Sequence, residues 1–128
     1  MIAAALCISV GAQLVSLPTN EFTLRWQHTV EKTLWEEDYV VAADWLLLTR
    51  ARIRGSGAGM EPPADAVKDE NGWSYRPADR WRRSVELARS EFGDDYELCI
   101  RQLCRRIGDI IGGRGVTTLK PCVKASMP

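Results

Sequence analysis

His28 is the only histidine of the chain and the side chain best suited to acid–base chemistry near neutral pH. A catalytic or metal-binding imidazole needs a carboxylate close by, and Glu37 and Glu31 are the candidates. Depending on the length of the intervening turn, His28 lies opposite Glu37 or opposite Trp35, at about 5 Å. Three interpretations stay open: a buried imidazole with a satisfied hydrogen bond, which we favour, a divalent metal site, and a site that recognises a ligand.

A second stretch with chemical potential is the turn at 55–59, which reads Gly-Ser-Gly-Ala-Gly. Glycines at alternate positions permit positive φ and a close backbone approach, and the N–H groups at Gly57–Gly59 would suit an anion. Ser56 is not part of a nucleophile elbow, because no helix follows it and Pro62 comes soon after. The turn therefore predicts recognition of a small anionic ligand rather than hydrolysis.

The ligand-binding candidates come from these two stretches: His28, Glu31, Lys32, Glu37, Ser56, Gly57 and Gly59. No residue is assigned as catalytic, and no metal or cofactor is assigned to the chain. Two classes of function follow. The first is a non-enzymatic binding or accessory module, and the alternative is a small metal- or ligand-dependent enzyme site centred on His28.

The four cysteines are a third group of reactive side chains: Cys7, Cys99, Cys104 and Cys122. An even number in a small β-rich chain favours disulfides if the compartment is oxidising. We predict the pairs Cys99–Cys104, which are separated by four residues, and Cys7–Cys122, which lie near the two ends. A zinc site and reduced thiols in the cytosol stay open as alternatives. The location predicted with the disulfides is the periplasm or cell envelope, and the cytoplasm is the alternative.

Three successive strands must position these residues. Apolar and polar residues alternate along 21–30, 34–41 and 45–54, which is typical of strands with one apolar face. The short turns between them predict an antiparallel meander. His28 and Glu37 fall on the apolar faces. A turn at 42–44 would place Arg50 opposite Glu36, as a charge pair on the solvated face.

The rest of the chain is also predicted to be rich in strands. Strand patterns cover Ala4–Val10, Gln13–Leu17, Gly72–Arg76, Ser84–Ala88, Tyr96–Ile100 and Val116–Leu119. Residues 2–10 also resemble a signal-peptide core, but no basic residue precedes them, so we favour a strand. Apolar residues three and four apart predict a short amphipathic helix over Leu103–Ile111. The expected fold is all-β, an antiparallel barrel or sandwich of about 8–10 short strands with one short C-terminal helix. A single domain is expected over 1–122, with a disordered tail at 123–128.

Charge and hydropathy exclude several classes of partner. The chain has 17 basic and 17 acidic residues among its 128, so neither nucleic acid nor an anionic membrane surface is an expected partner. The apolar runs are too short for a membrane span.

Three blocks of the sequence carry a family resemblance: His-Thr-Val-Glu-Lys at 28–32, Trp-Glu-Glu-Asp-Tyr at 35–39, and Gly-Ser-Gly-Ala-Gly-Met-Glu-Pro-Pro at 55–63. With them the chain resembles the bacterial family DUF1850, a domain of unknown function, over about residues 4 to 122. The family has no assigned activity, and its members are often encoded beside tripartite (TRAP/TAXI-type) transporters with periplasmic receptors. The resemblance therefore implies a transporter component as a partner.

Overall fold

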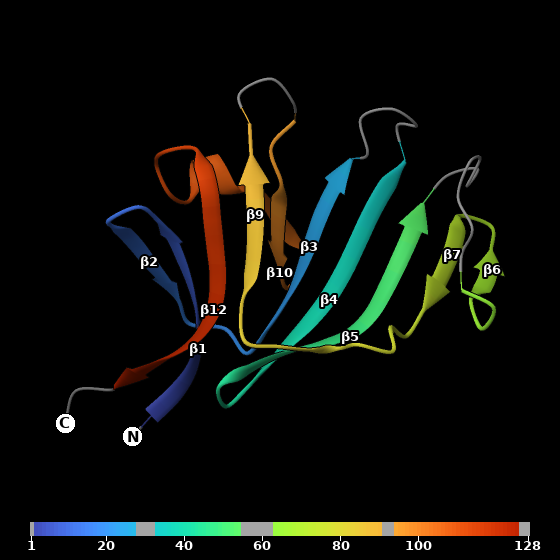
Figure 1. Ribbon diagram of the computed structural model, residues 1–128, viewed down its shortest axis with the longest axis horizontal. Coiled ribbons are helices and arrows are strands. Elements are labelled where there is room, and N and C mark those ends of the chain that lie inside the picture. Colours follow the sequence, from blue (N-terminus) through green and yellow to red (C-terminus); the bar gives the residue numbers. More distant parts are fainter. Residues whose placement is uncertain (1, 28–32, 55–62, 91–93, 126–128) are drawn as a thin grey trace.

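The computed structural model describes residues 2–27, 33–54, 63–90 and 94–125. Almost all of the regular structure in these residues is strand (Figure 1). In chain order the elements are β1 (Ile2–Val10), β2 (Gln13–Leu17), β3 (Glu21–Gln27), β4 (Leu34–Ala42), β5 (Trp45–Arg54), β6 (Val67–Asp69), β7 (Gly72–Tyr75), β8 (Trp81–Arg82), β9 (Val85–Arg89), β10 (Glu97–Ile100), β11 (Leu103–Arg106), the 3-10 helix η1 (Ile107–Asp109) and β12 (Gly115–Ala125). No helix in this part of the chain is long and apolar enough to cross a membrane.

The strands form two antiparallel sheets. The smaller sheet has the order β2-β1-β12-β9, and the larger has the order β11-β10-β3-β4-β5-β7-β6, with β8 also paired to β5. Neither sheet closes on itself within the described residues, so the fold is a sandwich and not a barrel. The all-β antiparallel fold expected from the alternating sequence is confirmed.

The core lies between the sheets and contains the apolar residues that alternate along their strands. These buried residues are Leu6, Ile8, Val10, Phe22, Leu24, Tyr39, Val41, Leu46, Leu48, Leu87, Leu98, Ile107, Ile111 and Leu119. A fully buried Leu or Ile side chain contributes about 1.5–3 kcal/mol relative to an exposed one. Because the set draws on strands from the whole length of the chain, the two sheets depend on each other for their stability.

The central meander β3–β4–β5 is confirmed, but its register differs from the expected one. Strands β3 and β4 pair as far as Gln27↔Leu34, so Glu37 lies opposite Leu24 and Trp35 opposite Trp26. Neither register proposed for His28 is therefore correct, because the paired ends are joined by the longer connection 28–33.

The register between β4 and β5 also differs from expectation. The turn at their junction has two residues, Ala43 and Asp44, with Ala43 at φ 55°. Thr49 is an extra residue in β5, since Asp38 pairs with Arg50 and Tyr39 with Leu48. A bulge of this kind shifts every later pair by one residue. Glu36 consequently faces Arg52 rather than Arg50.

Two expectations for the C-terminal part are wrong. Leu103–Arg106 is strand β11, paired with β10, and the only helix between 94 and 125 is the single 3-10 turn η1. The last strand does not end near Leu119, because β12 continues through Pro121 to Ala125 and pairs there with Ile2. The single domain over 1–122 and the disordered tail at 123–128 stay predictions.

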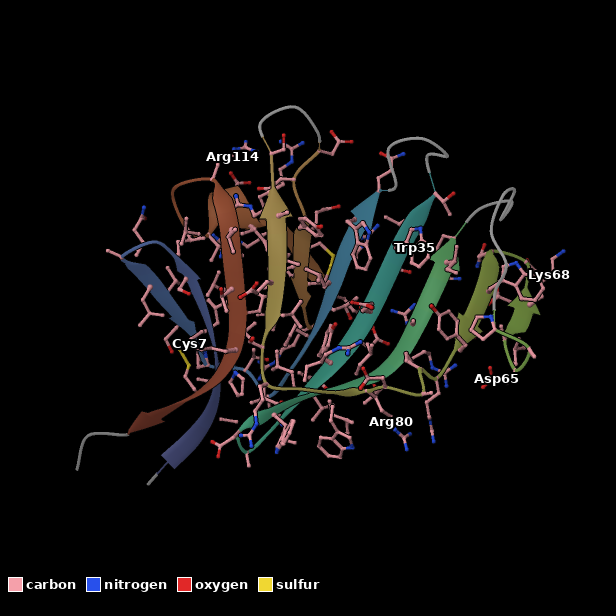
Figure 2. All side chains as sticks on the ribbon, in the orientation of Figure 1. Cys7, Trp35, Asp65, Lys68, Arg80 and Arg114 are labelled. Atoms are coloured by element: carbon pink, nitrogen blue, oxygen red, sulfur yellow. A yellow bond between two sulfur atoms is a disulfide. The ribbon has the colours of Figure 1, made fainter. Side chains whose placement is uncertain are left out.

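Both predicted disulfides are present. Cys7–Cys122 joins β1 to β12, with 5.7 Å between the Cα atoms (Figure 2). Cys99–Cys104 joins directly opposed residues of the β10–β11 hairpin, with 3.9 Å between the Cα atoms. Among the described cysteines none is free. The zinc and reduced-thiol alternatives do not apply to this structure.

One ion pair is fully enclosed between β9, β12 and η1. Arg89 donates from Nε and Nη2 to the two carboxylate oxygens of Asp95, at 2.9 and 3.0 Å. Its Nη1 donates to Thr117 Oγ1 and to the carbonyl of Gly113. Asp95 also accepts from the backbone N–H of Tyr96 and Gly108. The network fixes the connection before β10 and the 3-10 turn against the smaller sheet.

Candidate functional site

The outer face of the larger sheet carries a row of alternating charges across five strands. The row runs from Arg106 of β11 through Glu97 of β10, Arg25 of β3 and Glu36 of β4 to Arg52 of β5. Each residue is the direct cross-strand partner of the next. Opposite charges in such positions stabilise the pairing of strands by a few tenths of a kcal/mol each, about 0.2–1.

Glu36 is the centre of this row. Its carboxylate lies 3.5 Å from Arg25 Nε, 3.3 Å from Arg52 Nε and 3.0 Å from Arg54 Nε. The Glu36 side chain is only 15% exposed, so these contacts are screened less than those on an open surface. The Arg25 contact is not a hydrogen bond, because Arg25 Nε is buried without a hydrogen-bond acceptor. The three guanidinium groups hold the Glu36 carboxylate in one position.

Asp38 forms a second fixed pair on the same face. Arg52 donates from Nη1 and Nη2 to the two Asp38 oxygens, both at 2.6 Å, and Thr23 Oγ1 donates to Oδ1 at 2.8 Å. Burial raises the pKa of Asp38, but the hydrogen bonds and charge of Arg52 and Thr23 outweigh it and lower the pKa overall. The hydrogen bonds that Arg52 donates to Asp38 likewise raise the pKa of Arg52. Both groups are therefore charged at neutral pH, and neither is suited to transfer a proton.

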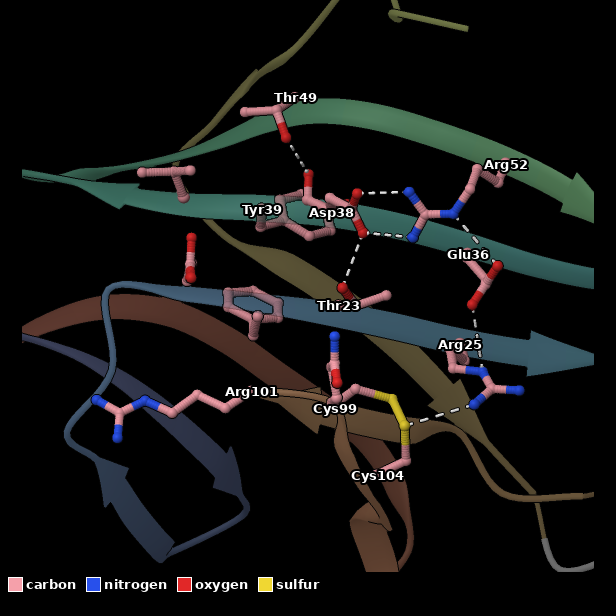
Figure 3. Close-up of a pocket in the computed structure, with 14 residues that line it drawn as sticks. Thr23, Arg25, Glu36, Asp38, Tyr39, Thr49, Arg52, Cys99, Arg101 and Cys104 are labelled. Carbon is pink, nitrogen blue, oxygen red and sulfur yellow. Dashed lines mark hydrogen bonds and ion pairs between the residues drawn. A yellow bond between two sulfur atoms is a disulfide. The ribbon is translucent and has the colours of Figure 1, made fainter. Parts of the chain in front are cut away.

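These pairs form the floor of a hollow of about 800 Å³ that opens to solvent (Figure 3). Its lining comes from β3, β4, β5 and the β10–β11 hairpin: Glu21, Phe22, Thr23, Arg25, Glu36, Asp38, Tyr39, Val40, Thr49, Arg52, Cys99, Arg101, Gln102 and Cys104. The Thr49 bulge lies at one side, where Thr49 Oγ1 donates to the carbonyl of Asp38. The hairpin turn Arg101–Gln102 forms the opposite side.

Arginines outnumber carboxylates only at the centre of this floor, since the lining as a whole has three arginines (Arg25, Arg52 and Arg101) and three carboxylates (Glu21, Glu36 and Asp38). Asp38 feels the charges of both Arg52 and Arg50, and Glu36 contacts three arginines, so four arginines surround two carboxylates. Arg101, at the rim, is exposed, and no described residue pairs with it. The hollow therefore offers a floor of fixed arginine–carboxylate pairs and, at its rim, one guanidinium with no partner in the described part of the chain.

Glu37 lies on the opposite, inner face of the sheet. Tyr39 donates its hydroxyl hydrogen to Glu37 Oε1 at 2.7 Å. Burial first, and then the charge of Glu37, raises the pKa values of Tyr39, Tyr75 and Tyr96. Stacked Trp26 and Trp35 follow in the same two strands, with ring centroids 6.1 Å apart. Glu37 is therefore an inward-facing carboxylate among aromatic rings, and its observed partner is a tyrosine rather than a histidine.

The other predicted ligand-binding residues lie outside the described residues: His28, Glu31, Lys32, Ser56, Gly57 and Gly59. What the structure does show is where their segments leave the sheet. β3 ends at Gln27 and β5 at Arg54, and both of these residues pair with Leu34 of β4. The two motif segments therefore begin after neighbouring strand ends. Among the described residues, no group of three or more His, Cys, Asp or Glu side chains is placed to hold a metal ion.

The residues of the hollow were not predicted as a site. The alternation of Arg50, Arg52 and Arg54 opposite Glu36 and Asp38 was visible in the sequence, but such pairs usually serve only a solvated sheet face. The contribution of Arg25, Arg101 and the cystine requires the pairing of β10 with β3, which the sequence alone does not specify.

Comparison with known families gives one match. The family model described as "Domain of unknown function (DUF1850)" matches residues 22–107. This range contains β3 from Phe22 onward, β4 to β11, and every residue of the hollow except Glu21. No curated protein and no solved structure matches the chain.

Proposed function

The chain belongs to the DUF1850 family, and on that premise we propose that it is a non-enzymatic binding module whose hollow receives an anionic group. The observation that carries the proposal is the exposed guanidinium of Arg101 at the rim, which has no partner among the described residues and lies beside a floor where four arginines surround Glu36 and Asp38. Arginine binds carboxylates and phosphates through two parallel hydrogen bonds. The ligand class is a small carboxylate or phosphate anion, or such a group on a larger partner.

The chemistry of the hollow supports binding over catalysis. The acidic side chains of its floor, Glu36 and Asp38, are already fixed by ion pairs, and the lowered pKa of Asp38 keeps it from acting as a general acid near pH 7. The floor is arranged before any ligand arrives, and a prearranged site loses less entropy on binding.

The proposed location is the periplasm or cell envelope, and the proposed partner is a transporter component. Support for the location comes from the two disulfides, which persist in oxidising compartments. Support for the partner comes only from the family resemblance. We also propose a second contact region for the anion at the end of the sheet. It consists of the anion-binding candidates of the motif segments: Lys32 and the glycine turn with Ser56, Gly57 and Gly59.

A titration with inorganic phosphate and with a dicarboxylate tests the anion proposal. Nuclear magnetic resonance shifts are expected to concentrate on Thr23, Arg25 and Arg101, and Arg101→Gln is expected to weaken binding several-fold. The matched control is Arg76→Gln, because Arg76 is also exposed and unpaired among the described residues but lies outside the hollow. Equal effects of the two substitutions, or shifts elsewhere, would contradict the assignment.

A pull-down from the native membrane fraction tests the partner. The wild-type chain is expected to retain transporter components, and Arg101→Gln to retain less if the anionic group belongs to that partner. If the anion titration succeeds and no transporter component is retained, the binding site stands and the partner assignment is wrong.

A further inference from the structure

The Cys99–Cys104 disulfide lies in the wall of the hollow, where a dissolved thiol can reach it. Both cysteines line the hollow, and Cys104 is partly exposed on edge strand β11. The other three residues of β11 are exposed, so little covers the strand. The second disulfide has the same pattern of burial, with Cys7 buried and Cys122 partly buried, but it does not line this hollow and it joins the two central strands of the smaller sheet.

The hairpin that contains this disulfide has an unfavourable turn. Its two turn residues, Arg101 and Gln102, have φ of 54° and 69°. This is the pattern of a type I′ turn, which normally takes Asn and Gly. For a non-glycine residue, the equilibrium constant for adopting the left-handed backbone conformation is lower by roughly tenfold or more. Such a conformation persists only where the surrounding structure imposes it. The bond between Cys99 and Cys104 imposes it, since the two residues flank the pair that closes the turn.

A guanidinium is in contact with one of the two sulfurs. Arg25 Nη1 donates a hydrogen bond to Cys104 Sγ at 3.4 Å (Figure 3). A positive charge beside a sulfur stabilises the thiolate, which is both the attacking and the leaving form in disulfide exchange. Arg25 therefore favours departure of Cys104 as an anion. For Cys7–Cys122 the described contact is the hydroxyl of Ser16, at 3.9 Å from Cys122 Sγ.

We propose that Cys99–Cys104 is a thiol–disulfide exchange site that accepts two electrons from an external dithiol. A thiolate of the dithiol attacks Cys104 Sγ, forms a mixed disulfide and expels Cys99 as a thiolate, which takes a proton from water. The second thiol of the donor, deprotonated to solvent, attacks the donor's own sulfur in the mixed disulfide. It expels Cys104 as a thiolate beside Arg25. The donor leaves as a disulfide, and the chain gains two reduced cysteines, with the Arg101–Gln102 turn free to relax.

The experiment treats the folded full-length chain with graded dithiothreitol at neutral pH, alkylates the free thiols and identifies them by mass spectrometry of the digest. Cys99 and Cys104 are expected to be alkylated together at a dithiothreitol concentration at least tenfold below the one that opens Cys7–Cys122. Simultaneous opening of both disulfides, or opening of Cys99–Cys104 only when the chain unfolds, would overturn the proposal. Anion binding is not needed for this result, so the two proposals fail separately.

Substitutions at two places test the roles of Arg25 and of the hairpin turn. Arg25→Gln is expected to raise the dithiothreitol concentration needed for reduction several-fold, because the Cys104 thiolate loses its positive neighbour, while Arg54→Gln leaves that concentration unchanged. Both arginines contact Glu36 and both are 30% exposed, but only Arg25 contacts Cys104. An equal increase for both would exclude the role of Arg25. Changing Arg101–Gln102 to Asn-Gly relieves the backbone strain of the turn and is expected to raise the dithiothreitol concentration needed for reduction by about tenfold. An unchanged concentration would exclude a contribution of the turn.

Discussion

Replacing Asp95 with asparagine is expected to be among the most damaging single substitutions in the described part of the chain. The Arg89 side chain is 0% exposed and that of Asp95 5% exposed. Asp95→Asn keeps the shape but removes the charge, so that the guanidinium stays buried without a counter-ion. An amide also accepts hydrogen bonds through one atom only, whereas Asp95 receives them through both oxygens.

The expected loss is about 3–5 kcal/mol in the free energy of unfolding, as found when one partner of a buried ion pair is removed. For a domain of this size, 1 kcal/mol corresponds to about 4 °C in Tm, so Tm is expected to fall by about 12–20 °C. Urea denaturation followed by tryptophan fluorescence measures the loss.

The matched control is Asp79→Asn. Asp79 receives a hydrogen bond from Arg82 at 2.9 Å, the same length as that from Arg89 Nε to Asp95, but the Asp79 side chain is 85% exposed. An exposed pair contributes little, so this variant is expected to unfold at nearly the wild-type urea concentration. A loss below about 1 kcal/mol for Asp95→Asn, or equal losses for both variants, would refute the reasoning from burial.

The same pair predicts a pH dependence. Burial raises the pKa of Asp95, but the hydrogen bonds from Arg89 and Gly108 outweigh it, so the pKa lies below its ordinary value. A carboxylate with a lowered folded pKa stabilises the fold above its unfolded pKa of about 3.9, and this contribution disappears as the pH falls through the folded pKa. The difference in stability between wild type and Asp95→Asn is therefore expected to be constant near neutrality and to shrink below about pH 4.

Three further outcomes are expected. All three tyrosines of the chain have raised pKa values: Tyr39, Tyr75 and Tyr96. Absorbance at the tyrosinate band is therefore expected to stay low through about pH 10, and stability to fall as the pH rises above that ordinary tyrosine value; half-ionisation at pH 10 in the folded protein would contradict this. Replacing Cys7 and Cys122 together by serine is expected to cost about 4–5 kcal/mol in urea denaturation, because their separation of 115 residues closes a long loop. Leu24→Ala, in the centre of the core, is expected to cost about 2–5 kcal/mol by the same assay, and a loss below about 1 kcal/mol would show that the site collapses around the smaller side chain.

The strands of the meander could be predicted because burial of one face imposes strict alternation, as along Phe22, Leu24 and Trp26. Their register could not. The extra residue Thr49 and the length of the 28–33 connection leave the alternation intact on each strand, yet they change which residues face each other. Because the candidate His28–Glu37 pair depended on register alone, it was the part of the site most sensitive to an error in register.

The segment Leu103–Ile111 shows how a short periodic pattern can mislead. Its apolar residues have helical spacing, but Ile107 enters the core from a 3-10 turn and Ile111 from the residues after it, while Leu103 lies exposed on an edge strand. The hairpin before it has Arg101 and Gln102 at its turn, with no glycine or asparagine to signal a reversal. The cystine was predictable from cysteine count and spacing, whereas the strand pairing around it was not.

The pairing of β1 with β12 constrains the order in which the chain can fold. The two strands are the central pair of the smaller sheet and run together from Ile2↔Ala125 to Val10↔Thr117. The β3–β4–β5 meander needs only contacts between neighbouring segments, which form quickly, whereas contacts across such a large sequence separation form slowly. Until β12 arrives, β1 has only β2 as a neighbour and presents an open strand edge, the feature that most readily recruits other chains into aggregates. The pairing of β1 with β12 is therefore the slow step of folding. The risk of aggregation is greatest before that step, while the edge of β1 is still unpaired.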